Sequence, residues 1–219
     1  MPVWQVLAAL GELASQGLLI PHVVASLARV AGGYLLAAAL AIPLGITMGW
    51  FPGAFRALNP VIQLLRPISP IAWIPLAILW FGVGDLSPVF LIFLSSVFPM
   101  VVNTTTGVHT IERHFIRAAQ NFGVSGFKLF RLVIFPAALP HIIVGMRISL
   151  GVAWLVLVAA EMIALHSGLG FLIMDSRNAG NRYDLVVAGM VLIGMIGLLL
   201  DGRVRRLERL NQLRWRYGR

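Results

Sequence analysis

Three charged residues stand inside long apolar stretches and are the first candidates for chemistry: Arg29, Arg147 and Glu161. A charge at mid-membrane depth costs about 2.5–3.5 kcal/mol, so each of them needs a partner or a function. Arg147 and Glu161 are fourteen residues apart. That spacing is about 21 Å along a helix, too far for the two to pair within it. Pairing of Arg29 with Glu161 is one interpretation, and attraction of an anionic substrate by Arg29 or Arg147 is the other.

A neutral polar group, Asn103 with Thr104 and the two threonines that follow, lies near the end of another apolar stretch. Amide and hydroxyl donors of this kind can bind an oxyanion. Hydrogen bonds to the helix backbone or to a neighbouring helix are the alternative for such threonines. Five residues therefore form the candidate translocation pathway: Arg29, Asn103, Thr104, Arg147 and Glu161.

Other kinds of chemistry find little support. The chain has no cysteine, and its five histidines are scattered, so we expect neither a thiolate nucleophile nor a metal site. No Gly-x-x-x-x-Gly-Lys-Ser/Thr phosphate loop occurs, which means that this chain should not bind ATP through such a loop. We therefore expect a protein that is not an enzyme and has no cofactor of its own.

The composition places these residues in a membrane. The chain is 59% hydrophobic and 11% charged, well outside the range of soluble domains. Several apolar stretches reach the roughly 20 residues that cross about 30 Å of hydrocarbon as a helix. We expect an all-α, polytopic membrane protein with one transmembrane domain over 1–219. The arginines fall in short loops and the tail, which favours membrane topology over nucleic acid binding.

Apolar length and polar breaks together predict the order of the elements. These are an interfacial helix at 1–21, three spans within 23–110 (23–50, 61–81 and 87–108), a cytoplasmic loop at 111–138, two spans within 139–200 (139–165 and 185–200) and a basic tail at 201–219. The first helix is expected to lie in the interface because Gln5, Glu12 and Gln16 share one face. Short loops are expected at 51–56 and 82–85, and a glycine-rich loop after 165.

Prolines mark the second predicted span: Pro67, Pro70 and Pro75. Each removes a backbone hydrogen bond and bends the helix axis. Broken helices of this kind line pathways in transporters, while kinks that serve packing alone are the other interpretation. Glycines of the first span, including Gly45 and Gly49, predict close approach between helices.

The charges orient the spans. Arginines and lysines gather in the loops on one side and in the tail, which the positive-inside rule assigns to the cytoplasm. The C-terminus is then cytoplasmic, and five spans place the N-terminus outside. That arrangement predicts either that the N-terminal helix inserts on its own or that relatives carry one span more.

A basic, amphipathic segment in the cytoplasmic loop is the most informative part of the sequence. Ile116, Ala119 and Phe122 recur at three-residue spacing, so a short helix can present an apolar edge to a partner. Gly123 can supply the positive-φ turn that ends such a helix. The predicted docking residues are Arg117, Ala118, Ala119, Phe122, Gly123, Val124 and Lys128.

This segment resembles the loop that permeases of ATP-binding cassette (ABC) importers insert into their ATPase subunits. The family pattern is Glu-Ala-Ala, three residues, Gly, nine residues, Ile, one residue, Leu-Pro. The matching residues are Ala118, Ala119, Gly123, Val133 (for Ile) and Pro136, while Arg117 replaces the Glu and Phe135 the Leu. Further stretches resemble the nitrate/sulfonate (taurine)/bicarbonate branch of this family: 66–75, 79–82, 145–147, 158–163 and 168–170.

The resemblance implies a type I importer permease fold with a cytoplasmic coupling helix, in a bacterial inner membrane. It implies two copies of an ABC ATPase, which bind ATP and Mg²⁺, and a second copy of the permease. It also implies a periplasmic or lipid-anchored substrate-binding protein, with membrane lipid around the spans. Taurine or another aliphatic sulfonate is the expected substrate, with nitrate or bicarbonate as the alternative. A channel or secondary carrier that works without ATP is a more distant alternative.

Overall fold

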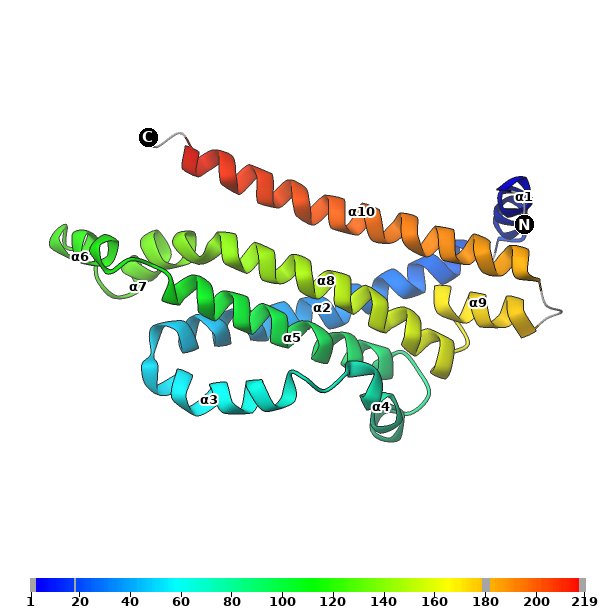
Figure 1. The fold of residues 1–219 in the computed structure, drawn as a ribbon, viewed down its shortest axis with the longest axis horizontal. Helices are drawn as coiled ribbons and strands as arrows, with labels where there is room; N and C mark the ends of the chain where they lie inside the picture. The colour runs from blue at the N-terminus through cyan, green and yellow to red at the C-terminus, as the bar shows by residue number, and fades with distance from the viewer. Residues whose placement is uncertain (1–2, 18, 179–181, 217–219) are drawn as a thin grey trace. The chain divides into compact units, whose positions relative to one another are not determined.

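The computed structural model describes residues 3–17, 19–178 and 182–216, and these ranges are helical with no strand (Figure 1). The ends of the predicted interfacial helix and basic tail, 1–2 and 217–219, lie outside the described residues. The helices are α1 (Val3–Ser15), α2 (Leu19–Trp50), α3 (Pro52–Leu65), α4 (Ile74–Phe81), α5 (Leu86–His109), α6 (Arg113–Asn121), α7 (Gly126–Leu129), α8 (Phe135–Ala164), α9 (Leu169–Asn178) and α10 (Tyr183–Arg216). A 3-10 turn, Pro70–Trp73, precedes α4, and a π-helical segment, Phe130–Ile134, joins α7 to α8.

The chain divides into two compact units, each with its own core. The first unit comprises Met1–Leu36, Ser69–Ser95 and Leu150–Asp201, and the second comprises Ala37–Ile68, Ser96–Ser149 and Gly202–Arg219. The core of the first unit consists of Ile74, Ala77, Leu91, Val156 and Ala160. The core of the second consists of Val108, Leu129, Ile134, Ala138 and Ile142.

Within the described residues, four helical stretches are long and apolar enough to cross a membrane. They are Leu19–Trp50, Leu86–His109, Gly126–Ile163 and Tyr183–Arg206. They correspond to the first, third, fourth and fifth predicted spans. A membrane-spanning protein made of helices is therefore confirmed.

The second predicted span, at 61–81, is interrupted, as its prolines predicted. The chain forms two helical pieces, Pro52–Leu65 and Pro70–Phe81, whose axes differ by 83°. The break has a local cause. Pro67 and Pro70 lack the amide hydrogen, and Ser69, the residue before Pro70, has ψ 128°, outside the α region that a following proline disfavours. The turn predicted at 51–56, in contrast, is wrong. Pro52 begins α3 at once, which its fixed φ favours at a first helical position.

The fourth span begins earlier than the predicted Leu139. Its apolar helical stretch starts at Gly126, so the polar part of the cytoplasmic loop ends about one helical turn after α6. The π-helical segment makes this continuity possible: the Phe135 N–H donates to the Phe130 carbonyl, five residues back. This wider turn precedes Pro136, which has no N–H to donate. The glycine-rich loop expected after 165 also contains a helix, α9.

Helices α2 and α5 pack closely within the second unit, as the glycines of α2 predicted. A Cβ at Gly45 would lie 2.6 Å from the Cβ of Thr104, and one at Gly49 would lie 2.5 Å from the Cβ of Val108. Such distances exclude any side chain without a shift of one helix. The Thr105 hydroxyl donates to the Gly45 carbonyl at 3.2 Å, which adds a bond between the two helices.

Candidate functional site

Helix α6 lies beside the end of α5 and the start of α8 in the second unit, and has two different faces (Figure 1). Ile116 and Ala119 face inward, where they pack against the core of that unit. Phe115, Ala118 and Phe122 are exposed, and their spacings of three and four residues place them along one face beside the inward one. The predicted coupling helix is thus a real helix that is held on one face and open on the other.

A complete Schellman motif ends α6. The Gly123 N–H donates to the Gln120 carbonyl at 2.9 Å, and the Val124 N–H donates to the Ala119 carbonyl at 3.0 Å. Gly123 has φ +75°, the left-handed conformation that this motif needs and that glycine adopts without strain. Val124 and Ala119 then pack together against the core. The turn therefore fixes the direction in which the chain leaves α6.

The open face of α6 carries large aromatic side chains. Phe122 is 87% exposed and Phe115 is 57% exposed. The cations around them, Arg113, Arg117 and Lys128, are also exposed. Of the predicted docking residues, Arg117, Ala118, Phe122, Gly123 and Lys128 are on the surface, while Ala119 and Val124 pack inward. An exposed aromatic pair framed by cations is typical of a surface that a partner covers.

The candidate pathway residues fall in two places. Arg29 and Glu161 belong to the first unit, where they form an ion pair. Asn103, Thr104 and Arg147 belong to the second unit. There the Asn103 side-chain amide donates to the Pro99 carbonyl at 2.8 Å. Thr104 is fully buried, and its Cβ faces Gly45.

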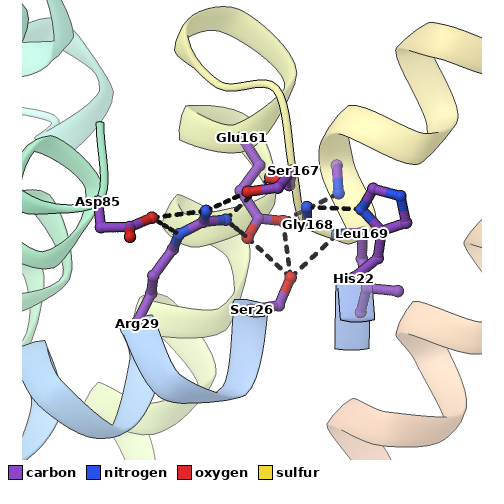
Figure 2. A network of polar contacts seen from close by, with 9 residues as sticks. His22, Ser26, Arg29, Asp85, Glu161, Ser167, Gly168 and Leu169 are labelled. Carbon is purple, nitrogen blue, oxygen red and sulfur yellow. Dashed lines mark hydrogen bonds and ion pairs between the residues drawn. The ribbon is translucent and has the colours of Figure 1, made fainter. Parts of the chain in front are cut away.

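Figure 2 shows the polar network around Glu161, a carboxylate with no exposed surface. Its two oxygens accept hydrogen bonds from three residues. Arg29 Nη1 donates to Oε1 at 2.7 Å. The Ser26 hydroxyl lies 2.7 and 2.9 Å from Oε1 and Oε2. The backbone N–H of Gly170 donates to Oε2 at 2.9 Å. A buried carboxylate is tolerated only with this kind of compensation, because its desolvation costs several kcal/mol.

All three guanidinium nitrogens of Arg29 donate hydrogen bonds. Besides Glu161, Nη1 donates to the Ser167 carbonyl at 2.9 Å, and Nη2 donates to the Ser167 hydroxyl at 2.5 Å. Nε and Nη2 both donate to Asp85 Oδ1, at 2.8 and 2.7 Å. One arginine on α2 therefore ties together the end of α8, the turn before α9 and the turn before α5. Of the two alternatives left by the sequence, the ion pair of Arg29 with Glu161 is present.

Several members of this network were missed by the sequence reasoning. Ser26 stands three residues before Arg29 on α2, so the shared helical face was an available signal. Its hydroxyl also accepts from the Leu169 N–H at 2.9 Å. The Gly168 N–H donates to His22 Nδ1 at 2.9 Å. Asp85 carried no signal, because an acidic residue in a short polar turn is ordinary.

A separate, exposed cluster lies in the first unit at the start of α10. Arg182 Nη2 is 2.8 Å from Glu12 Oε2 and 2.7 Å from Asp184 Oδ2. It links α1 to the turn before α10. These residues line an open groove of about 370 Å³ together with Trp4, Gln5, Ala8, Ala9 and Tyr183. The hydrogen bond and the positive charge of Arg182 hold the pKa of Glu12 below its usual range.

This pKa shift predicts how the attachment of α1 depends on pH. A lowered carboxyl pKa means that the stabilising contribution is present at neutral pH and is lost as pH falls through the lowered value. We expect the wild-type protein to have a higher thermal midpoint than a Glu12→Gln variant at neutral pH, with the difference closing as the pH falls below the ordinary glutamate pKa of about 4.3. Thermal unfolding of the purified protein across this range checks it. A difference that stayed constant at acid pH would contradict the role given to the ion pair.

Among the described residues, no group of three or more His, Asp or Glu side chains is placed to hold a metal ion. The features that stand out are the exposed aromatic side chains of α6 and the buried ion-pair network around Glu161.

Known proteins share both the sequence and the fold. The family model "Binding-protein-dependent transport system inner membrane component" matches residues 41–211. The taurine transport system permease protein TauC of Escherichia coli (strain K12) is 42% identical over 190 residues, 86% of this chain and 68% of TauC. The nitrate import permease protein NrtB of Leptolyngbya laminosa is 38% identical over 183 residues, 84% of this chain and 65% of NrtB.

Among solved structures, an inward-facing conformation of the MetNI methionine ABC transporter superimposes with a TM-score of 0.76 at 17% identity. The match covers 89% of this chain and 96% of that chain. This likeness establishes the type I permease fold. By sequence and by fold, the chain belongs to the binding-protein-dependent transport system inner membrane components, the permease subunits of ABC transporters.

Proposed function

We propose that this chain is the permease subunit of an ATP-driven importer for a small oxyanion. Taurine or another aliphatic sulfonate is the first candidate, and nitrate or bicarbonate is the second. The relatives named for taurine and for nitrate support this class, since each of these compounds presents a singly charged group whose charge is spread over oxygens. The choice within the class is left to the substrate-binding protein that delivers the ligand.

The open face of α6 is the observation that carries this proposal. Phe115 and Phe122 expose large apolar surfaces at a polar end of the second unit, and burying one such side chain is worth about 1.5–3 kcal/mol. A cytoplasmic ABC ATPase is the partner that covers them. In this assignment Arg117, Ala118, Phe122, Gly123 and Lys128 meet the ATPase. Ala119 and Val124 hold α6 on its own core.

Two features of the chain support the proposed assembly: the missing phosphate loop and the single docking helix. The sequence has no phosphate loop, so the ATPase subunits bind ATP and Mg²⁺, and this subunit is not catalytic. One docking helix per permease gives two permeases and two ATPases around a two-fold axis. A periplasmic or lipid-anchored binding protein completes the importer in a bacterial inner membrane.

Alternating access then needs a rigid path from α6 into the membrane. Helix α6 packs on Leu129 and Ile134, which belong to the stretch that continues without a break into α8. Closure of the ATPase pair on ATP would move α6 and tilt α8, opening the cavity outward. ATP and the loaded binding protein must each favour this state energetically for transport to occur.

The positions of the charged residues support an orientation of the chain in the membrane. With the loop of α6 and the basic tail in the cytoplasm, Arg29 near the start of α2 and Glu161 near the end of α8 are assigned to the outer ends of their spans. Asn103, Thr104 and Arg147 remain proposed pathway residues on the cytoplasmic side of the midplane. In the Arg29 network, Glu161 serves structure, since its oxygens are already occupied by donors.

Uptake by proteoliposomes tests the proposal. The permease is reconstituted with its ATPase, and radiolabelled taurine, nitrate and bicarbonate are each offered with the cognate binding protein outside. We expect uptake of one oxyanion that requires internal ATP and the binding protein. Uptake that follows an imposed ion gradient, and persists without the ATPase, would establish a secondary carrier or channel instead.

A further inference from the structure

The two carboxylates of the Arg29 network are held very differently. Glu161 has no exposed surface, and its oxygens accept from Arg29, Ser26 and Gly170. The Asp85 side chain is 76% exposed, while the Arg29 side chain that it contacts is only 5% exposed. Asp85 therefore sits on the outer edge of a buried arginine, as Figure 2 shows.

That outer edge has the geometry of an oxyanion contact. Nε and Nη2 of Arg29 converge on a single oxygen of Asp85, at 2.8 and 2.7 Å. The Ser167 hydroxyl accepts from the same Nη2, so its own proton can donate to an anion on that edge. Guanidinium edges of this kind bind carboxylate and related oxyanions through paired, charge-assisted hydrogen bonds.

The turn that carries Asp85 is loosely packed at its two glycines. Gly82 has φ +75°, and an added Cβ at Gly82 or at Gly84 would meet no atom within 4 Å. Asp85 itself precedes α5, and within the described residues its carboxylate hydrogen-bonds to Arg29 alone. Release of Asp85 breaks two hydrogen bonds to Arg29, but the freed carboxylate is mostly exposed and can be hydrated, while Glu161 keeps Arg29 in place.

We propose that the Nε–Nη2 edge of Arg29 is an exchangeable oxyanion site for which Asp85 is the internal stand-in. A monoanionic oxyanion, such as a sulfonate, nitrate or bicarbonate, replaces the Asp85 carboxylate on Arg29. The exchange puts one negative charge in place of another, so the buried Arg29–Glu161 pair stays compensated throughout. Release of Asp85 frees the turn before α5 from α2. This inference rests on the proposed function for the identity of the anion.

Removal of the stand-in charge is the test. The permease–ATPase complex, purified without its binding protein, is titrated with sodium methanesulfonate, nitrate or bicarbonate at constant ionic strength against chloride. The thermal midpoint reports binding, because a ligand bound to the folded state stabilises it. We expect Asp85→Asn to lower the half-saturating concentration of the oxyanion about tenfold, since it removes a competing charge-assisted bond. The double variant Arg29→Lys/Asp85→Asn keeps a cation beside Glu161 but lacks the Nε and Nη2 donors. The oxyanion should therefore no longer raise its thermal midpoint.

Glu12→Gln is the matched control, because Glu12 is another exposed carboxylate that pairs with an arginine, Arg182, at 2.8 Å. It should leave the oxyanion titration unchanged. Equal half-saturating concentrations in wild type and Asp85→Asn would overturn the inference, as would a response that survives in Arg29→Lys/Asp85→Asn. If Asp85→Asn lowers the half-saturating concentration but the wild type shows no ATP-driven uptake, the oxyanion site stands and the proposed function is refuted. If the wild type shows ATP-driven uptake but Asp85→Asn leaves the half-saturating concentration unchanged, the proposed function stands and the oxyanion site is refuted.

Discussion

Replacing Arg29 with methionine should lower the free energy of unfolding by about 3–5 kcal/mol, because Glu161 would keep its burial and lose its cation. The loss is large for this position because Glu161 has no exposed surface, so water cannot take over the role of the guanidinium. Denaturation of the purified protein in mixed micelles, followed by far-ultraviolet circular dichroism, measures the change.

The matched control is the double variant Arg29→Met/Glu161→Met, which removes both charges and keeps similar volume. It should recover a substantial part of the lost stability, since an apolar pair often replaces a buried ion pair at little cost. Asp85→Asn should cost less than about 1 kcal/mol, as expected for a partner that is mostly exposed. A single Arg29→Met variant as stable as the double variant would contradict the structural role given to the pair.

Replacing Gly123 with valine should abolish ATP-driven transport while leaving the spans inserted. Gly123 has φ +75°, and a β-branched residue held there costs of order 1–3 kcal/mol of local strain. The strain would open the Schellman motif, and α6 would lose its fixed direction relative to α8. Uptake into proteoliposomes together with ATP hydrolysis measures the effect. We expect uptake to disappear, and hydrolysis to lose its stimulation by the binding protein.

Two further variants separate backbone strain from bulk. Gly53→Val lies in the first turn of α3, where an added Cβ meets no atom within 4 Å, and it should transport normally. Gly123→Asn should recover much of the activity, because asparagine tolerates the left-handed conformation better than other non-glycine residues. Full transport by Gly123→Val would show that the direction of the chain after α6 is unimportant for coupling.

The sequence was informative where composition and spacing act locally. Apolar length located four spans, and helical periodicity located α6. The orientation of α6 was wrong for Ile116 and Ala119, which were predicted to face a partner and pack instead on the core of the second unit. Gly123 predicted the end of that helix because few other residues adopt a positive φ. Of the three residues predicted to form the apolar edge that faces a partner, Phe122 is the one that is exposed, because it lies just beyond the last turn of α6.

Other features depend on tertiary geometry, and the sequence could not determine them. Pro67 and Pro70 predicted a disturbed helix, but they did not predict the 83° angle between its two pieces. Charge alone paired Arg29 with Glu161, but it could not show that the turn of Asp85 also reaches Arg29. The π-helical segment before Pro136 and the helix after Gly168 stand in sequence contexts that usually indicate loops.

Site-directed photo-crosslinking from position 122 tests the central claim most directly, namely that α6 receives work from a separate ATPase. The probe amino acid is placed at Phe122, which is 87% exposed, and at Leu64 of α3, which is 73% exposed, as the control. The importer is assembled in membrane nanodiscs with its ATPase and irradiated. We predict a crosslink to the ATPase from position 122 and none from position 64. An assembled importer that hydrolyses ATP and transports, yet gives no crosslink from position 122, would contradict it.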